Sequence, residues 1–597
     1  MKRNKVSAKK NLRIDALQDM ARKAIHARQY DDAGQYLDEA LEINPRDAQT
    51  LALRGMTLFW QNDLQQAIGY SMLAVQYAPQ EFRYKQGFIA LASPVKLGQA
   101  NPHFEKALIA CCDDPRVDCT TAWSLWGSML MTQPGFKEIF KVSEVGDIRS
   151  FDKEVFNSDV DFSPLLSPLF LKGLRRIVVY GRLFEDFLTA LRAALIADLD
   201  RAEKIFLPEA HAALSVALSF YCFNTEYIFD VTEEERSAAE KLRRQVETDE
   251  NVSADASRVA LCACYSPLYA LANAQDIARR HAHSAARDVV QTQISAWDRI
   301  KKAASEVAAL TEISDDVSMR VRVQYEESPY PQVISFVREI INEDVPEASF
   351  AGQAAQVLVA GCGTGREAFE LASIIPDAKV LAVDLSRTSL AYATLKAEEF
   401  GLGNVTFRQA DILKLAALEQ RFDFISCGGV LHHMKDPVAG WKVLKDLLKA
   451  DGLMRIGLYS ELGRAAVVKA REIIARGGYD STPEGMRRFR RDCRGLLDPE
   501  SYGTITACWD FYHMSRLRDY LFHAQEHRFG LPQIKHILQD LGLELTGFNI
   551  SEEVRERYRK ENPDDTACLD LDRWYAFEQK YPDTFGSMYQ FFCRAAA

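Results

Sequence analysis

The pattern of apolar and polar residues divides the 597-residue chain into three regions. The last region, 321–597, alternates short apolar, β-branched stretches with longer segments of helical periodicity. Alternation of this kind predicts a doubly wound sheet, in which ligands bind at the carboxyl ends of the strands. The expected strands are Gln356–Ala360, Lys379–Asp384, Asn404–Gln409, Phe422–Cys427, Leu453–Tyr459, Leu543–Ile550 and Met588–Arg594, with helices such as Ser389–Glu399 and Pro437–Leu448 between them.

The middle region, 126–320, shows apolar residues at helical spacing and carries no recognisable motif. We expect a helical domain that links the regions on either side. Its apolar helical segments are Leu165–Leu199, Glu209–Phe223 and Asp255–Ala274, and Glu233–Glu250 reads as a charged, solvated helix or loop.

The first region, 10–125, repeats itself with an offset of 34 residues. Small residues at the repeated positions let two antiparallel helices touch closely, and a proline ends each unit. The repeat resembles the tetratricopeptide repeat, followed by a degenerate third unit. The resemblance implies a groove that holds a peptide or protein partner, although the units could instead form a stacking cap on the helices that follow. The matching positions are Leu17, Ala21, Ala33, Tyr36, Ala40 and Pro45, then Leu51, Gly55, Ala67, Tyr70, Ala74 and Pro79.

Composition limits the classes of function. The chain is 47% apolar and 26% charged, as expected for globular protein, and its net charge of −11 argues against a general nucleic-acid binder. Its 12 cysteines form no C-x-x-C pair and fit buried thiols in a reducing cytosol. We predict no secretory leader, because the basic N-terminus leads to no apolar stretch, and no membrane span, because the apolar stretch Ile177–Leu199 is interrupted by charges. The expected location is the cytoplasm.

The strand Gln356–Ala360 runs directly into a G-x-G-x-G turn formed by Gly361, Gly363 and Gly365. Glycines let the backbone approach a ligand closely, and the following helix offers unpaired N–H groups. The next strand ends at Asp384, which suits a ribose diol. The third glycine comes one residue too early for a nicotinamide or flavin site. The turn therefore predicts a nucleoside-bearing cofactor of another kind.

The motifs at the ends of the first four strands together resemble those of class I S-adenosylmethionine-dependent methyltransferases. By that resemblance, the turn glycines line the methionine and ribose portions, and Asp384 binds the ribose hydroxyls. One position departs from the pattern. Many of these enzymes carry an acid two residues before the first glycine, which helps to hold the methionine ammonium group, and Val359 stands there instead.

The remaining cofactor contacts follow from the same resemblance. Leu385 would flank the adenine ring, and Asp411, with the backbone of Ala410 or Ile412, would meet the adenine amino group. Cys427-Gly428 would border the sulfonium.

The whole arrangement resembles bacterial fusions of tetratricopeptide repeats with a methyltransferase. The stretch 324–331 is similar to the motif that begins the methyltransferase part of that group, although Gln332-Val333 replaces its usual Arg-Trp pair. Two prolines with aromatic neighbours suit a rigid crossing over the cofactor pocket, or a simple turn at the start of the domain.

Candidate acceptor residues follow strands four and five. His432 and His433 lie where the methyl group should be, and Tyr459 and Glu461 end the next strand. Methyl transfer needs a base only if the acceptor arrives protonated. We predict these four as catalytic candidates. The alternatives are that a histidine only orients the loop or packs on adenine, and that Glu461 is a solvated loop acid.

An insertion at 462–528 follows, and we expect it to cap the acceptor side. Its arginine run, 487–491, reads as a solvated helix face, or as a contact for an acidic acceptor or a partner. His523, Glu526 and His527 spell an H-x-x-E-H zinc pattern, but no distal acidic ligand is identifiable. We therefore predict no metal, and expect these side chains to line the acceptor pocket or to bond with each other.

These patterns lead to a cytoplasmic enzyme that methylates N or O of an acceptor. The acceptor would be a peptide or protein docked by the repeats, with a small metabolite as the other possibility. The competing hypothesis is a catalytically weak scaffold that binds S-adenosylmethionine. Nucleic-acid methylation is disfavoured by the acidic balance and by the lack of an N/D-P-P-Y/F motif after strand four.

Overall fold

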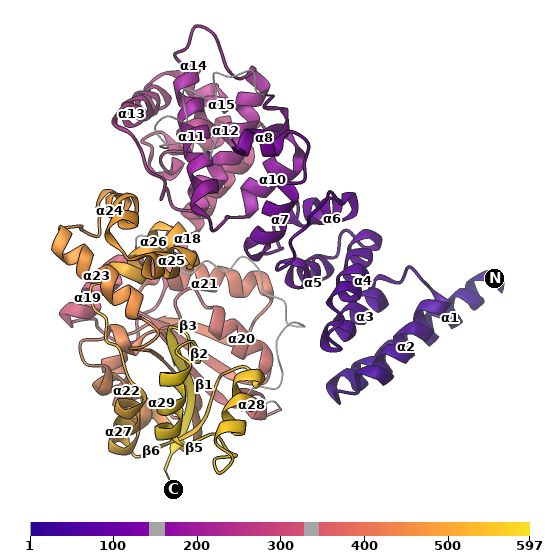
Figure 1. Ribbon diagram of the computed structural model, residues 1–597, viewed down its shortest axis with the longest axis vertical. Coiled ribbons are helices and arrows are strands. Elements are labelled where there is room, and N and C mark those ends of the chain that lie inside the picture. Colours follow the sequence, from indigo (N-terminus) through magenta and orange to yellow (C-terminus); the bar gives the residue numbers. More distant parts are fainter. Residues whose placement is uncertain (1, 142–160, 327–345, 351, 597) are drawn as a thin grey trace. The chain divides into compact units, whose positions relative to one another are not determined.

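The computed structural model describes residues 2–141, 161–326, 346–350 and 352–596 (Figure 1). The chain forms two compact units, Met1–Ile294 and Ser295–Ala597. Within the described ranges, no helix has both the length and the apolar character needed to cross a membrane. All 12 cysteines are free thiols, and all but Cys508 are buried.

The first unit begins with helical hairpins whose helices recur at the spacing seen in the sequence. Helix α2 begins at Tyr30 and α4 at Leu64. The carboxylates of Asp47 and Asp63 cap the starts of α3 and α4 by accepting backbone N–H groups. A Cβ atom on Gly55 would lie 2.9 Å from the Ala67 carbonyl oxygen, so only glycine allows this approach of α3 to α4. The helices are α1 (Lys2–His26), α2 (Tyr30–Ile43), α3 (Ala48–Trp60), α4 (Leu64–Tyr77), α5 (Phe82–Ala92), α6 (Pro102–Cys112), α7 (Trp123–Leu130) and α8 (Phe136–Lys141).

The rest of the first unit is helical, with more breaks than the apolar periodicity suggests. The expected helical segment Leu165–Leu199 is two helices, because Ile177 and Gly181 adopt extended backbone between them. The segment expected from Asp255 stops being helical after Cys262, ahead of Pro267. The main helices are α10 (Pro168–Arg176), α11 (Arg182–Asp198), α12 (Pro208–Asn224), α13 (Glu233–Thr248), α15 (Ala256–Cys262) and α16 (Ala274–Arg280).

The second unit is built on one seven-stranded sheet in the order β3-β2-β1-β4-β5-β7-β6, which confirms the seven strands expected from the sequence. The first five strands are parallel, and β7 runs antiparallel between β5 and β6. The carboxyl ends of the parallel strands β1 to β5 therefore meet at one edge of the sheet. The strands are β1 (Gln356–Ala360), β2 (Lys379–Asp384), β3 (Val405–Gln409), β4 (Phe422–Gly428), β5 (Leu448–Tyr459), β6 (Leu543–Phe548) and β7 (Met588–Ala595).

Helices cover both faces of this sheet (Figure 1). Along β1, Leu358 and Ala360 enter one apolar core, and Val357 and Val359 enter the other. This alternation explains why the strand is apolar throughout. The first core is covered by α22 (Pro437–Leu447), α27 (Leu531–Leu541), α28 (Glu552–Glu561) and α29 (Leu571–Lys580), and the second by α20 (Arg366–Ile374) and α21 (Arg387–Phe400).

The insertion after β5 is a helical subdomain closed at its base. The amide N–H of Glu461 donates to the Phe529 carbonyl and that of Phe529 to the Tyr459 carbonyl, so the insertion leaves and rejoins the sheet at the same point. The arginine run lies on its second helix and is not a fully solvated face, because Arg490 is buried and donates to the Phe511 carbonyl oxygen at 3.0 Å. The helices are α23 (Ala465–Gly477), α24 (Pro483–Leu496), α25 (Pro499–Ala507) and α26 (Met514–Leu521).

Candidate active site

The glycine turn after β1 needs its glycines for conformation and for space. Gly361, Gly363 and Gly365 have φ angles of 79°, 51° and 93°, a region that other residues rarely adopt. A Cβ atom on Gly361 would lie 2.3 Å from the Val430 side chain, which belongs to the loop after β4. The turn therefore packs against the end of β4 and leads directly into α20.

Asp384 ties the ends of β1 and β2 together. Its Oδ2 accepts the N–H of Gly363 at 2.9 Å, and its Oδ1 accepts the N–H of Ser386 at 2.9 Å. Burial raises the pKa of this carboxyl above its ordinary value. Each oxygen keeps a second lone pair, so the carboxylate can also accept from two hydroxyl groups, as binding of a ribose diol requires.

Asp411 carries an unsatisfied oxygen beside the same edge. The side chain is buried, its Oδ1 accepts the N–H of Leu413 at 3.0 Å, and its Oδ2 has no hydrogen-bond partner. A buried polar atom without a partner is costly, so this oxygen fits a donor on a ligand. The amino group of adenine is such a donor. The neighbouring Ala410 and Ile412 are buried in the apolar core, so only their backbone groups could reach a ligand.

The end of β4 presents backbone to the site. The Cys427 side chain is buried in the apolar core, whereas Gly428 is exposed at the strand end. Burial raises the pKa of the Cys427 thiol well above its ordinary value, so this group stays protonated. Leu385, after β2, is half-buried. The predicted cofactor residues thus lie at the ends of β1 to β4.

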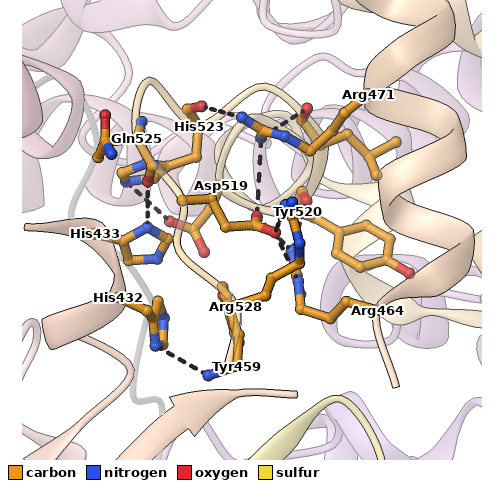
Figure 2. A network of polar contacts seen from close by, with 12 residues as sticks. His432, His433, Tyr459, Arg464, Arg471, Asp519, Tyr520, His523, Gln525 and Arg528 are labelled. Carbon is orange, nitrogen blue, oxygen red and sulfur yellow. Dashed lines mark hydrogen bonds and ion pairs between the residues drawn. The ribbon is translucent and has the colours of Figure 1, made fainter. Parts of the chain in front are cut away.

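His432 is fixed against strand β5. The ring is buried and stacks on Tyr459 with 3.6 Å between ring centroids, and its Nδ1 accepts the Tyr459 N–H at 3.3 Å (Figure 2). Because Nδ1 accepts, Nε2 carries the hydrogen of the neutral ring, and Nε2 has no partner. This arrangement orients the loop after β4.

His433 is held in the opposite tautomer. Its Nδ1 lies 2.8 Å from the Gln525 carbonyl oxygen, which can only accept, so Nδ1 carries the hydrogen and Nε2 keeps a lone pair (Figure 2). Burial lowers the pKa of His433 below its ordinary value, so the ring is neutral at pH 7. Nε2 is therefore a free base close to the end of β4.

His523 connects His433 to a residue far away in the sequence. It stacks on His433 with 3.7 Å between centroids, and its Nδ1 accepts the Gln525 N–H at 3.1 Å. Its Nε2 lies 3.9 Å from Oδ1 of Asp519, and the same oxygen accepts the hydroxyl of Tyr325 from α19 (Asp316–Glu326). Burial lowers the pKa of His523 to about 4.

The histidine cluster contains one group of possible metal ligands among the described residues. His433, Asp519 and His523 place possible ligand atoms within 4.8 Å of one another. However, Nδ1 of His523 accepts the Gln525 N–H, so Nε2 of the neutral ring carries the hydrogen and offers no lone pair to a metal. The H-x-x-E-H pattern of His523, Glu526 and His527 does not form a zinc site either, because two of its side chains bond elsewhere. Glu526 pairs with Arg464, and Nε2 of His527 bonds to the Gln525 side chain. The absence of a metal stays a prediction.

A buried ion pair holds the insertion onto β5. The Glu526 side chain is 0% exposed and accepts from Arg464 through both oxygens, at 3.1 and 2.8 Å. The Arg464 guanidinium lies 3.7 Å from the centre of the Tyr459 ring (Figure 2). Glu461, by contrast, is exposed. Its predicted role as a base gains no support from the described contacts, while Tyr459 serves as the surface on which His432 and Arg464 pack.

Contacts from the segment before the sheet complete the cofactor side, and none of these contacts was expected from the sequence. The hydroxyl of Thr311 accepts the Asp411 N–H at 2.8 Å. The carboxylate of Glu326 accepts the N–H groups of Arg387 and Thr388 and so caps α21. The stretch 324–331 had drawn attention to Tyr325 and Glu326, and its residues 327–331 lie outside the described ranges.

Comparisons with known proteins agree with this geometry. Residues 352–480 match the family model of a methyltransferase domain. An uncharacterized protein of Synechococcus is 31% identical over 207 residues, which cover 32% of this chain and 48% of that protein. A ubiquinone biosynthesis O-methyltransferase of Dinoroseobacter shibae is 31% identical over 145 residues, which cover 24% of this chain and 55% of that enzyme. The chain thus spans about half the length of the curated relatives it matches.

Among solved structures, PKMT2 from Rickettsia typhi in complex with AdoHcy is similar with a TM-score of 0.32 at 18% identity, over 47% of this chain and 52% of that one. The matched family, together with the glycine turn, Asp384 and the open oxygen of Asp411, defines the class. The C-terminal unit contains a class I methyltransferase domain. Its cofactor is S-adenosylmethionine.

Proposed function

We propose that the protein transfers a methyl group to an oxygen or nitrogen of an acceptor held beneath the insertion, with His433 as the general base. The tautomer of His433 carries this proposal. The Gln525 carbonyl holds the hydrogen on Nδ1 and leaves a neutral, buried base at the end of the strand that borders the sulfonium. At the end of the neighbouring strand β5, Tyr459 stacks on His432, and the Arg464 guanidinium packs on the Tyr459 ring.

When bound, S-adenosylmethionine supplies the methyl group and leaves as S-adenosylhomocysteine. The acceptor lone pair forms the new bond to the methyl carbon as the carbon–sulfur bond breaks, and the acceptor proton moves to Nε2 of His433. The insertion positions this base through Gln525, which contacts both His433 and His523. Asp384 and Asp411 hold the nucleoside end in place.

A hydroxyl is the acceptor that suits this base best. A neutral imidazole can share the proton of a hydroxyl as the bond forms, whereas an aliphatic ammonium ion would have to lose its proton before it could react. The curated relative from Dinoroseobacter shibae is described as an O-methyltransferase, which supports the same choice. His432, Tyr459 and Glu461 stay in the proposal as neighbours of the acceptor.

We infer a second role for the N-terminal helices, as tetratricopeptide-like repeats that dock a peptide or protein acceptor. The buried Ala33, Ala40, Ala67 and Ala74 at the repeated positions support that relationship. We propose that the chain consists of three parts: repeats at 10–125, a helical linking domain at 126–320, and the methyltransferase part at 321–597 with its insertion at 462–528. The free thiols support a reducing compartment, and we propose the cytoplasm.

The test is incubation of the purified protein with S-adenosylmethionine carrying a deuterated methyl group. A cell lysate is first split by size into metabolites and proteins, and mass spectrometry then finds the labelled product. We expect label on a hydroxyl oxygen. Label in the protein fraction would support docking through the repeats, and label in the metabolite fraction would contradict that role. Binding of the cofactor without S-adenosylhomocysteine formation in either fraction would favour the scaffold hypothesis.

A further inference from the structure

Val359 leaves the position of the usual acid without a charge. The side chain is fully buried in the core between the sheet and α20. Parallel register pairs Val359 with Ser426 on β4, and Ser426 with Arg455 on β5. Side chains at paired positions point to the same face of a sheet, so these three residues form a row across it. Ser426 and Arg455 are polar, whereas Val359 at the other end of the row belongs to the apolar core.

Glu367, in the first turn of α20, lies over this row. Its Oε1 accepts hydrogen bonds from the Ser426 hydroxyl and from the Arg455 guanidinium. Nε of Arg455 also donates to the Ser426 hydroxyl, at 3.1 Å. A carboxylate therefore reaches the face of the sheet that Val359 occupies, but it comes from the helix rather than from the strand.

The second oxygen of Glu367 faces the end of β4. Oε2 lies 3.9 Å from the place where a Cβ atom on Gly428 would be, and among the described residues it accepts no hydrogen bond. The side chain is 23% exposed, so a ligand can reach it. Burial, and then the charge of Glu367, raise the pKa of Cys427, and the same charge acts on Cys362. The carboxylate thus lies between the glycine turn and β4.

We propose that Glu367 binds the α-ammonium group of S-adenosylmethionine through Oε2. The inference rests on the proposed use of this cofactor and adds a residue that the family pattern does not assign. Arg455 and Ser426 hold Oε1 and so fix the direction of Oε2. Of the two cations of the cofactor, the sulfonium has no N–H group, so only the ammonium can donate a hydrogen bond to this oxygen, and a hydrogen bond between two charged groups is among the stronger polar contacts.

Calorimetry with two ligands tests the assignment. S-adenosylhomocysteine carries the ammonium group, and its deaminated analogue keeps the carboxylate, thioether and nucleoside but lacks the amine. We expect Glu367→Gln to weaken S-adenosylhomocysteine about tenfold or more and to leave the analogue unchanged. Glu370→Gln, one turn further along the same helix, is the matched control and should affect neither ligand.

Other outcomes overturn the proposal. Equal weakening of both ligands would mean that Glu367 only supports the sheet through Arg455, and unchanged affinity for both would mean that the ammonium binds elsewhere. If Glu367→Gln does not fold, Glu367→Asp keeps the charge but shortens the reach, and it should again weaken only the ligand with the amine. Failure of the unmodified protein to bind either ligand would refute the cofactor assignment itself.

Discussion

In the cofactor half of the site, the ends of β1 and β2 join through residues close together in the sequence, and Thr311 reaches Asp411 from 100 positions away, whereas the acceptor half depends on contacts between distant segments. Asp384 reaches Gly363 across 21 positions. The hydroxyl of Tyr325 reaches Asp519 across 194 positions, and His433 reaches Gln525 across 92. The first half uses backbone N–H groups and glycines, while the second uses stacked rings and buried ions. We therefore expect mutations in the two halves to fail in different ways.

The largest effect should come from His433→Gln in the acceptor half. Loss of the base should lower the turnover rate by about 10² to 10⁴-fold, and affinity for S-adenosylhomocysteine should stay unchanged because the cofactor half is intact. His536→Gln on the exposed face of α27 is the matched control. Parallel calorimetry and product formation measure both quantities. A loss of cofactor affinity equal to the loss of rate would show that the halves are not separable.

Glu526→Gln should destabilise the insertion next most strongly. The change removes the negative partner of a buried Arg464 and should cost about 3–5 kcal/mol in local unfolding free energy. Hydrogen exchange of the amides in 462–528 measures the change, since local unfolding shows there first. Glu472→Gln, exposed on α23, is the control. Equal protection in the two variants would mean that the pair does not hold the insertion.

Asp384→Asn should have a smaller effect, on the cofactor half alone. Both backbone N–H groups lose a charged acceptor, because one of them then meets a neutral carbonyl oxygen and the other an NH2 group that cannot accept, and the ribose contact weakens. We expect affinity for S-adenosylhomocysteine to fall about ten- to a hundredfold, with the fold of the insertion unchanged. Asp377→Asn, exposed before β2, is the comparison variant. An unaltered dissociation constant would remove Asp384 from the site.

The smallest expected effect is the contribution of His523 to the pH dependence of the free energy of unfolding. Its pKa is lowered by burial from 6.5 to about 4, so between those values the unfolded chain binds a proton that the folded protein does not. The stabilising contribution of the neutral ring is complete above pH 6.5 and is lost as the pH falls toward 4. The slope is at most about 1.4 kcal/mol per pH unit. His523→Asn should therefore lose stability less steeply than the unmodified protein in urea unfolding between pH 7 and 4.5. Parallel curves for the two proteins would contradict this role.

The strand ends of the cofactor half could be predicted from the sequence because Asp384 and Asp411 stand at the ends of apolar stretches, whereas the contact from Thr311 could not. Strands β1 and β2 have the expected bounds, Asp384 is the last residue of β2, and Asp411 lies shortly after the end of β3. The start of β5 was placed too late. Leu448 pairs with Phe422 ahead of a register irregularity, and a regular apolar run gives no sign of such a feature.

The acceptor half could not be read in the same way. The spacing of His523, Glu526 and His527 matches a metal-binding motif. The contacts of each side chain depend, however, on how the insertion folds back onto the end of β5. His523 stacks on His433, and Glu526 turns to Arg464 at the other end of the insertion. Local periodicity contains no information about such long-range pairs. Similarly, nothing near Tyr325 in the sequence indicates Asp519 as its partner.

The capping of α21 by Glu326 has a practical consequence for dissecting the protein. Thr311 and Glu326 both precede residue 352, where the match to the methyltransferase family begins. A fragment trimmed to the matched residues would lose the hydroxyl that accepts the Asp411 N–H and the carboxylate that caps the helix after Asp384. A fragment that begins at residue 352 therefore lacks contacts that the methyltransferase domain of this chain uses. A fragment that keeps both contacts must begin before Thr311.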